Sequence, residues 1–245
     1  MKTILLTGAT RGIGLATAKR LLARGCRVLA LGRDFRRFDR EIELRSPAVE
    51  RIAFDLRRLE AIESLVEGLP PLDVLVNNAA MLTAQPFDRY PLAERRDLIA
   101  VNLEAPAELA RACLARWLAR PQAAQNASST ERGRIVNVAS VAAFGGHPDV
   151  WYGASKAALI NLTKSLAKRY GPEGVLVNAV APGPTKTDMF ERLPPERITE
   201  FERLVLARRF AEPDEVARVI EWLALDAPEY VNGATIDVTS GAYLR

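Results

Sequence analysis

Tyr152 and Lys156 have the chemistry and the spacing of a proton-transfer pair. They lie in the stretch Trp151-Tyr152-Gly153-Ala154-Ser155-Lys156, at the start of a long segment with helical periodicity. Residues four apart lie on the same face of a helix, one turn from each other. An ammonium group there favours the phenolate and lowers the phenol pKa from its ordinary value of about 10. The pair could therefore act as acid and base, although an aromatic anchor beside a solvated lysine has the same spacing.

A glycine-rich turn follows the first apolar run of the chain. Residues 3–7 predict a strand, and Thr7-Gly8-Ala9-Thr10-Arg11-Gly12-Ile13-Gly14 leads from it directly into a helical pattern. Glycine allows a sharp turn and a close approach to a phosphate, and the free N–H groups of the helix start attract its charge. The spacing G-x-x-x-G-x-G differs from the common G-x-G-x-x-G fingerprint. We predict a dinucleotide phosphate site here, with a plain tight turn as the alternative.

The end of the second predicted strand, at 27–31, indicates which dinucleotide binds. Gly32 stands where NAD-binding folds place an acidic residue for the ribose hydroxyls. Arg33 follows at once, and Arg11 lies in the glycine turn. Two guanidinium groups would bind a 2′-phosphate that a carboxylate would repel. The sequence therefore favours NADP(H) over NAD(H), with a solvated loop arginine as the alternative interpretation of Arg33.

Polar and small residues also follow the later strands. In open α/β sheets, ligands bind outside the carboxyl ends of the strands. The residues concerned are Asp55 and Leu56 after 51–54, Asn77-Asn78-Ala79-Ala80 after 73–76, Ser140 after 134–138, and Ala181-Pro182-Gly183-Pro184-Thr185-Lys186-Thr187 after 175–180. We expect them to meet at one edge of the sheet, with the proline-fixed loop over a nicotinamide.

Seven strand patterns, the last at 235–238, alternate with helical patterns along the chain. Helices are expected at 35–44, 59–67, 92–100, around 110–118, at 152–170 and after Pro213. This alternation predicts an α/β, single-domain Rossmann fold over residues 1–245, a doubly wound seven-stranded parallel sheet with helices on both faces. The helical excursion at 188–209 is the expected substrate lid, and the polar stretch 120–132 is expected to be an exposed loop.

Composition narrows the class of partner. The net charge of +4 comes from 34 basic and 30 acidic residues without a long basic block, so no nucleic-acid partner is indicated. The sole histidine, His147, excludes a multi-histidine metal site, and Cys26 and Cys113 are expected to be buried free thiols. No apolar run approaches the roughly 18 residues of a membrane span. We expect a cytoplasmic protein that binds a small molecule and no metal.

Taken together, these residues resemble the short-chain dehydrogenase/reductase family over essentially the whole chain. The matching motifs are Thr7-Gly8-x-x-x-Gly12-x-Gly14, Asp55, Asn77-Asn78-Ala79, Asn102, Ser140, Tyr152-x-x-x-Lys156 and Pro182-Gly183 with Thr187. The resemblance implies a catalytic tetrad. In it Tyr152 exchanges the proton, Lys156 lowers the Tyr152 pKa and holds the nicotinamide ribose, Ser140 polarises the carbonyl, and Asn102 holds a relay water. It also implies cofactor contacts from Gly8, Thr10, Arg11, Gly12, Ile13, Gly14, Arg33, Asp55, Leu56, Asn78, Ala79, Tyr152, Lys156, Pro182, Gly183, Thr185 and Thr187.

Within the family, the sequence looks most like the bacterial 3-oxoacyl-carrier-protein reductases. The glycine turn, the stretch Asn178-Ala179-Val180-Ala181-Pro182-Gly183 and the length carry this likeness. It implies an NADPH-dependent reductase that interconverts carbonyls and secondary alcohols and forms a homotetramer, or a dimer. Sugar, steroid and small-ketone dehydrogenases that use NAD(H) share these features, and a non-catalytic NADP-binding regulator is a further alternative.

Overall fold

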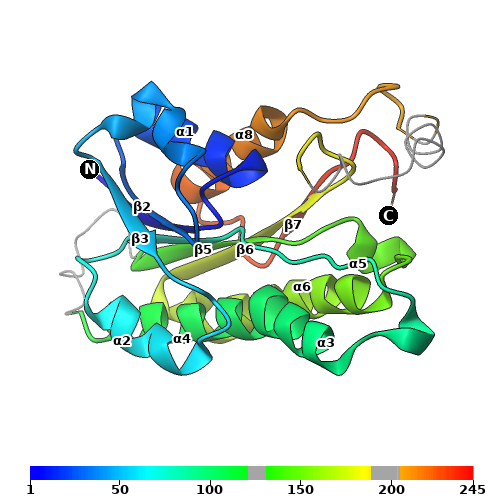
Figure 1. The fold of residues 1–245 in the computed structure, drawn as a ribbon. Coiled ribbons are helices and arrows are strands. Elements are labelled where there is room, and N and C mark those ends of the chain that lie inside the picture. The colour runs from blue at the N-terminus through cyan, green and yellow to red at the C-terminus, as the bar shows by residue number, and fades with distance from the viewer. Residues whose placement is uncertain (121–130, 189–202, 204, 245) are drawn as a thin grey trace.

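A single parallel sheet forms the centre of the computed structural model, which describes residues 1–120, 131–188, 203 and 205–244 (Figure 1). Its strand order is β3-β2-β1-β4-β5-β6-β7, and every neighbouring pair is parallel. The strands are β1 (Thr3–Thr7), β2 (Arg27–Gly32), β3 (Val49–Ala53), β4 (Val74–Asn77), β5 (Gly133–Val138), β6 (Val175–Pro182) and β7 (Thr235–Val238). The predicted seven-stranded Rossmann sheet is confirmed.

Helices cover both faces of the sheet, as a doubly wound fold requires. On one face lie α1 (Gly12–Ala23) and α8 (Pro213–Leu225) (Figure 1). On the other lie α2 (Ile62–Glu67), α3 (Leu92–Ile99), α4 (Ala105–Leu118) and α6 (Val150–Tyr170) (Figure 1). A π-helical turn, η5 (Ala100–Glu104), joins α3 to α4, and the short helix α5 (Ala142–Gly145) precedes α6. Among the described residues, no helix has the length and apolar character needed to span a bilayer.

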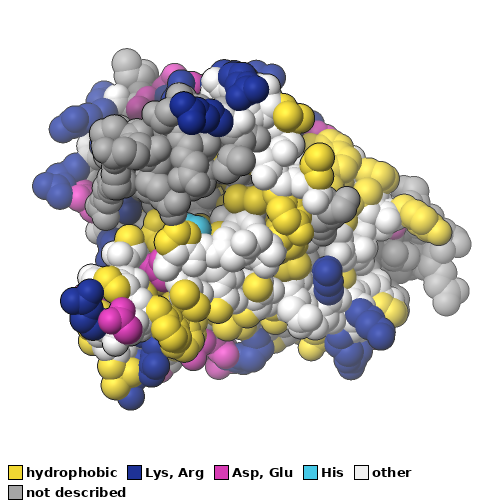
Figure 2. All heavy atoms as spheres, turned by 90° about the vertical axis from the view of Figure 1, so that its right-hand side faces the viewer, with side chains coloured by type: hydrophobic (Ala, Val, Ile, Leu, Met, Phe, Trp, Pro, Cys, Tyr) yellow, Lys and Arg dark blue, Asp and Glu magenta, His cyan; other side chains and the backbone are white. Residues whose placement is uncertain are grey.

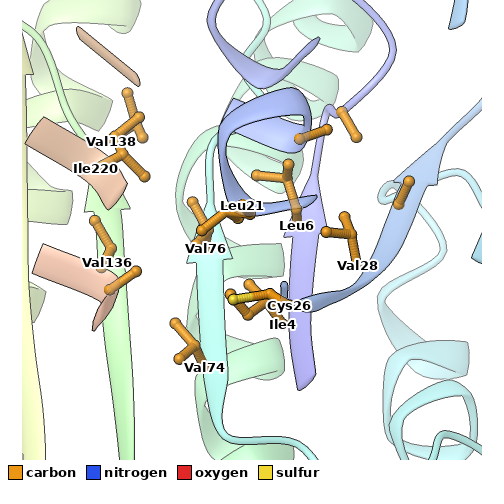
Figure 3. Close-up of a cluster of buried hydrophobic side chains, with 14 of the residues drawn as sticks. Ile4, Leu6, Leu21, Cys26, Val28, Val74, Val76, Val136, Val138 and Ile220 are labelled. Atoms are coloured by element: carbon orange, nitrogen blue, oxygen red, sulfur yellow. The ribbon is translucent and has the colours of Figure 1, made fainter. Parts of the chain in front are cut away.

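The central strands are apolar because both of their faces are buried. Alternate side chains of β1, β4 and β5 point toward α1 and α8, as Figure 3 shows for Ile4 and Leu6, Val74 and Val76, and Val136 and Val138. The residues between them, including Leu5, Leu75 and Ile135, pack on the opposite face in a cluster with Trp117 of α4. This packing fixes the register of the strands and the edge at which they all end.

The helix predicted at 35–44 is wrong. The structure has two 3₁₀ turns there, η1 (Phe38–Arg40) and η2 (Ile42–Arg45). Phe38 and Leu44 are both fully buried, but a spacing of six residues puts them on different sides of an α-helix. Breaking the segment into short turns lets both side chains reach the core.

Two further predicted segments fall largely outside the described residues. Of the expected lid at 188–209, positions 189–202 and 204 lie outside them, and so do positions 121–130 of the expected loop at 120–132. Helix α6 begins two residues before the predicted start, and α8 has Pro213 in its first turn as predicted.

The glycine turn between β1 and α1 is held by contacts in which a side chain would not fit. Gly8 has φ +63°, and a Cβ there would lie 2.8 Å from the Cα of Ala79. A Cβ on Gly14 would lie 2.0 Å from the carbonyl oxygen of Gly8. The Nδ2 group of Asn78 donates to the carbonyls of Thr7 and Gly8, at 3.0 and 3.1 Å. The turn is therefore closely packed against the segment that follows β4.

We predict that Gly14→Ala lowers the free energy of unfolding by about 1–3 kcal/mol, because the turn must open to admit a methyl group. Gly68→Ala is the matched control. Gly68 has ordinary helical angles, φ −73° and ψ −11°. A Cβ added there would lie no closer than 3.6 Å to another atom. That change should be neutral or stabilising by about 0.4–1 kcal/mol. Urea denaturation measures both, and equal stabilities of the two variants would contradict the account.

Candidate active site

The predicted site residues gather at the carboxyl edge of the sheet. The strand order reverses between β1 and β4, so the connections that leave these two neighbours run to opposite faces. Ligands of open α/β sheets bind at such a switch point. Figure 2 views the molecule from this side, and the lysine and arginine side chains lie mainly toward the rim of the view.

Helix α6 presents Tyr152 and Lys156 on one buried face. The side chains are 8% and 1% exposed. The Lys156 ammonium donates to the carbonyl oxygen of Val138, the last residue of β5, at 2.8 Å. It lies 5.8 Å from the centre of the Tyr152 ring. The Ser140 hydroxyl, two residues beyond β5, acts on the Tyr152 phenol and lowers its pKa. The structure thus brings together three members of the predicted tetrad.

The electrostatics of this group differ in one respect from the sequence-based expectation. Burial raises the pKa of Tyr152, although the Ser140 hydroxyl lowers it and the charge of Asp149 raises it further. The predicted lowering by Lys156 therefore does not dominate, because desolvation of the phenolate costs more. Burial lowers the pKa of Lys156 to about 8, so the ammonium is mostly retained at neutral pH.

Asn102, the fourth member of the tetrad, is fully buried in the π-helical turn η5. Its Oδ1 accepts from the backbone N–H of Met81 at 2.7 Å, and its Nδ2 donates to the Met81 carbonyl at 2.9 Å. The second hydrogen on Nδ2 goes to the Ser155 hydroxyl at 3.1 Å. Both donors of the amide are thus used in joining the segment after β4 to α6. The relay water predicted for Asn102 stays a prediction.

The predicted cofactor residues border the glycine turn from three sides. Thr10 packs on Gly32, where a Cβ would lie 2.5 Å from its methyl group. Thr187 packs on Gly12, where the corresponding distance is 3.0 Å. Leu56 is buried, and the remaining cofactor residues from the sheet end are Asn78, Ala79, Pro182, Gly183 and Thr185. A side chain at position 32 would require Thr10 to move, and the acidic residue typical of NAD sites is absent there.

A basic group flanks the turn, and part of it was missed in the sequence. Arg11 and Arg33 were predicted, whereas Arg37 was not. The Arg37 guanidinium donates to Asp188 at 2.6 Å, and Arg11 lies 3.7 Å from the other oxygen of that carboxylate. Arg57 holds the pKa of Asp55 down at about 2, and Arg33 contributes to this shift. An ion pair that spans 151 residues leaves no signal in the spacing of the sequence.

Asp149 is the second residue that the sequence analysis missed. It is 1% exposed and caps the first turn of α6, where its carboxylate accepts from the Tyr152 N–H at 3.0 Å. An aspartate three residues before Tyr152, at the start of a predicted helix, is a recognisable N-cap signal. The ring centre of His147 lies 5.1 Å from that of Tyr152.

Comparison with known proteins finds relatives over nearly the whole chain. The family model described as short chain dehydrogenase matches residues 2–198. The 3-oxoacyl-[acyl-carrier-protein] reductase FabG of Aquifex aeolicus is 34% identical, over 99% of this chain and 97% of its own. The 3beta-hydroxysteroid dehydrogenase 1 of Eggerthella lenta is 33% identical, over 99% of this chain and 94% of its own.

A solved structure shares the fold at similar identity. It is a Beutenbergia cavernae protein assigned as an NAD(P)-dependent gluconate 5-dehydrogenase, with NADP bound at low occupancy. It superposes with a TM-score of 0.88 at 34% identity and covers 98% of this chain and 96% of its own. The chain belongs to the short-chain dehydrogenase family of oxidoreductases that act on CH–OH groups.

Proposed function

We propose that this protein is an NADP(H)-dependent reductase that interconverts a carbonyl compound and a secondary alcohol. The observation that carries the proposal is the placement of Tyr152 and Lys156 on one buried face of α6, with the Ser140 hydroxyl acting on the phenol. An acid, an orienting hydroxyl and a cation converge beside the glycine turn, as a carbonyl-reducing site needs.

The residues present fit a phosphorylated nicotinamide dinucleotide. Gly8, Gly12 and Gly14 let the turn pack closely on its own backbone, on the segment after β4 and on Thr187. Such a glycine turn before a helix start allows a close approach to a pyrophosphate, whose charge the free N–H groups would attract. Arg11, Arg33 and Arg37 form the basic group beside the turn, and Gly32 lacks the carboxylate that would repel a 2′-phosphate. Lys156 would hold the nicotinamide ribose, and the loop 182–187 would cover the ring.

In the proposed mechanism, the cofactor supplies the hydride to the carbonyl carbon, and the protein supplies orientation and the proton. The Ser140 hydroxyl donates to the carbonyl oxygen and polarises the carbonyl group. The Tyr152 phenol delivers its proton to that oxygen as negative charge develops there. The raised pKa of Tyr152 supports this direction, because it keeps the phenol protonated. Lys156 would favour the phenolate that remains and would pass a proton back to it.

The substrate class is the finer part of the proposal. Likeness to FabG supports a 3-oxoacyl thioester. Likeness to the steroid and gluconate enzymes keeps steroids, sugars and small ketones as alternatives, with NAD(H) as the alternative cofactor. A non-catalytic NADP-binding regulator is less well supported, because Ser140, Tyr152 and Lys156 are all present and meet. The homotetramer or dimer, the cytoplasmic location and the substrate lid at 188–209 are also proposals, drawn from the family resemblance.

Tyr152→Phe tests the catalytic claim. It removes the proton donor and leaves the ring and the cofactor contacts in place. We expect NADPH to bind with unchanged affinity while kcat falls by roughly 10²–10⁴-fold. The assay follows NADPH oxidation with 3-oxoacyl thioesters, keto-sugars and cyclic ketones. Turnover comparable to that of the parent protein would contradict the proposal, and no turnover by the parent with any carbonyl would favour the regulator.

Arg33→Ala tests the cofactor preference. Loss of a charge-assisted hydrogen bond of about 1.5–3 kcal/mol should weaken NADPH binding by on the order of tenfold or more and leave NADH binding nearly unchanged. Arg36→Ala is the control, because Arg36 is 88% exposed and pairs with Asp34. Fluorescence titration gives the six dissociation constants, for NADPH and NADH with the parent protein and with each variant. Equal losses for NADPH and NADH would show that Arg33 does not contact the phosphate.

The pKa of Lys156, about 8, predicts how binding depends on pH. The ammonium is present below this pKa and is lost above it, so affinity for NADPH should decrease as pH rises from 7 to 9.5. A loss of roughly tenfold corresponds to one charge-assisted hydrogen bond of about 1.5 kcal/mol. In Lys156→Met, binding should be weaker and independent of pH over this range. A parent affinity that stays constant across the range would contradict the assigned role of Lys156.

A further inference from the structure

Asp149 makes more hydrogen bonds than a helix cap needs. Its Oδ1 accepts from the N–H of Tyr152, which is the usual capping interaction. Its Oδ2 accepts from the N–H of Ala84 at 2.9 Å and from the hydroxyl of Tyr90 at 3.3 Å. The N–H and hydroxyl of Thr83 lie farther away, at 3.4 and 3.5 Å. The buried carboxylate thus connects the first turn of α6 to a segment 65 residues earlier.

The connected segment has an unusual backbone at its centre. Ala84 has φ +56°, a left-handed conformation that residues with a side chain seldom adopt. Such a conformation persists where the surroundings impose it, and it occurs often at functional sites. The Asp149 carboxylate accepts the N–H of this very residue. We conclude that the carboxylate helps to hold the left-handed turn.

The segment is joined to α6 on both sides of Tyr152. On one side, Asn102 binds both backbone groups of Met81 and donates to Ser155, three residues after Tyr152. On the other side, Asp149 binds Ala84 and the Tyr152 N–H. Met81 is two residues beyond Ala79, whose N–H donates to Thr7 beside the glycine turn. The phenol-bearing turn of α6 and the proposed cofactor site are therefore connected through residues 79–84.

We propose that Asp149 is a positioning residue for the reaction, holding residues 81–84 against the first turn of α6 so that the Tyr152 phenol stays in register with the cofactor site. This inference rests on the proposed function, because the register matters only if Tyr152 delivers a proton to a substrate beside the cofactor. Asp149 itself acts through Tyr152 and contacts no reacting atom. A displacement of about 1 Å in such a site can cost on the order of 10²-fold in rate.

Asp149 also contributes to the charge around Tyr152. Within the described part of the chain, the charged and titratable groups that face the phenol are Lys156 on α6, Asp149 at the helix cap and His147 between α5 and α6, with the neutral hydroxyls of Ser140 and Tyr90 nearby. The negative charge of Asp149 raises the pKa of Tyr152. Replacing it with a neutral group should lower that pKa. Alcohol oxidation needs the phenolate, so its rate rises with pH as the phenol ionises. This rise should then occur at lower pH.

Asp149→Asn separates positioning from capping. Asparagine caps helices as well as aspartate does, so α6 should keep its start. The Nδ2 group of the new asparagine cannot accept from the N–H of Ala84, however, so the hydrogen bond between position 149 and Ala84 is lost. We expect NADPH affinity within about threefold of the parent value, kcat lower by on the order of 10–100-fold, and a pH profile of alcohol oxidation displaced to lower pH. Asp214→Asn, which changes an acid in the first turn of α8, is the control and should alter none of these quantities.

Amide hydrogen exchange supplies a readout that does not depend on activity. The Thr83 and Ala84 amides should exchange faster in Asp149→Asn than in the parent protein and be unchanged in Tyr152→Phe. Unchanged exchange at these amides would overturn the inference whether or not the protein reduces any carbonyl. Faster exchange with parent-like kcat and pH profile would overturn it as well. If exchange is faster in Asp149→Asn but the parent protein reduces no carbonyl, the result would instead count against the proposed function.

Discussion

Burial of the Lys156 ammonium is the constraint on which the arrangement of the site depends. Moving a charge out of water is costly unless it is paired or hydrogen-bonded. Lys156 is 1% exposed and donates to the carbonyl of Val138, where β5 ends. This bond fixes α6 against the sheet edge at the level of the Ser140 hydroxyl. Desolvation lowers the pKa of Lys156 to about 8, so the site keeps a cation near neutral pH.

Two buried polar side chains extend this constraint to the rest of the site. Asn102, in the π-helical turn, and Asp149, at the cap of α6, each bind backbone groups of residues 81–84 and a group of α6. Asn78 and Ala79, just before that segment, hold the glycine turn. The helix that bears Tyr152 and the proposed phosphate site are thus joined by partly buried hydrogen bonds. Leaving the buried side chain of Asn102 or Asp149 unpaired would be costly.

The sequence predicts the sheet well because parallel strands buried on both faces are continuous apolar runs. All seven strands occur where strand patterns were found, the central ones as such apolar runs, and three members of the tetrad meet as the motif spacing indicated. Local patterns were less informative where single side chains decide the structure. Phe38 and Leu44 must both reach the core, so the helix predicted around them is broken into 3₁₀ turns.

Long-range polar contacts were the features that could not be predicted. Asp188 meets Arg11 and Arg37, and Asp149 meets residues 83–90, only because the fold brings distant segments together. The sign of the Tyr152 pKa shift depends in the same way on burial, which a Tyr-x-x-x-Lys motif does not reveal. Spacing therefore indicates the candidate reacting groups, whereas packing determines their protonation.

The central claim is that a hydride passes from a nicotinamide cofactor to a carbonyl carbon at this site, while Tyr152 supplies the proton. The most direct test uses NADPH deuterated at the reactive carbon of the nicotinamide ring, with a 3-oxoacyl thioester in ordinary water, and mass spectrometry of the product. The account predicts an alcohol that carries deuterium on its carbinol carbon and none on its exchangeable hydroxyl. An alcohol formed without deuterium, or no reduction of any carbonyl in a broad panel, would contradict it.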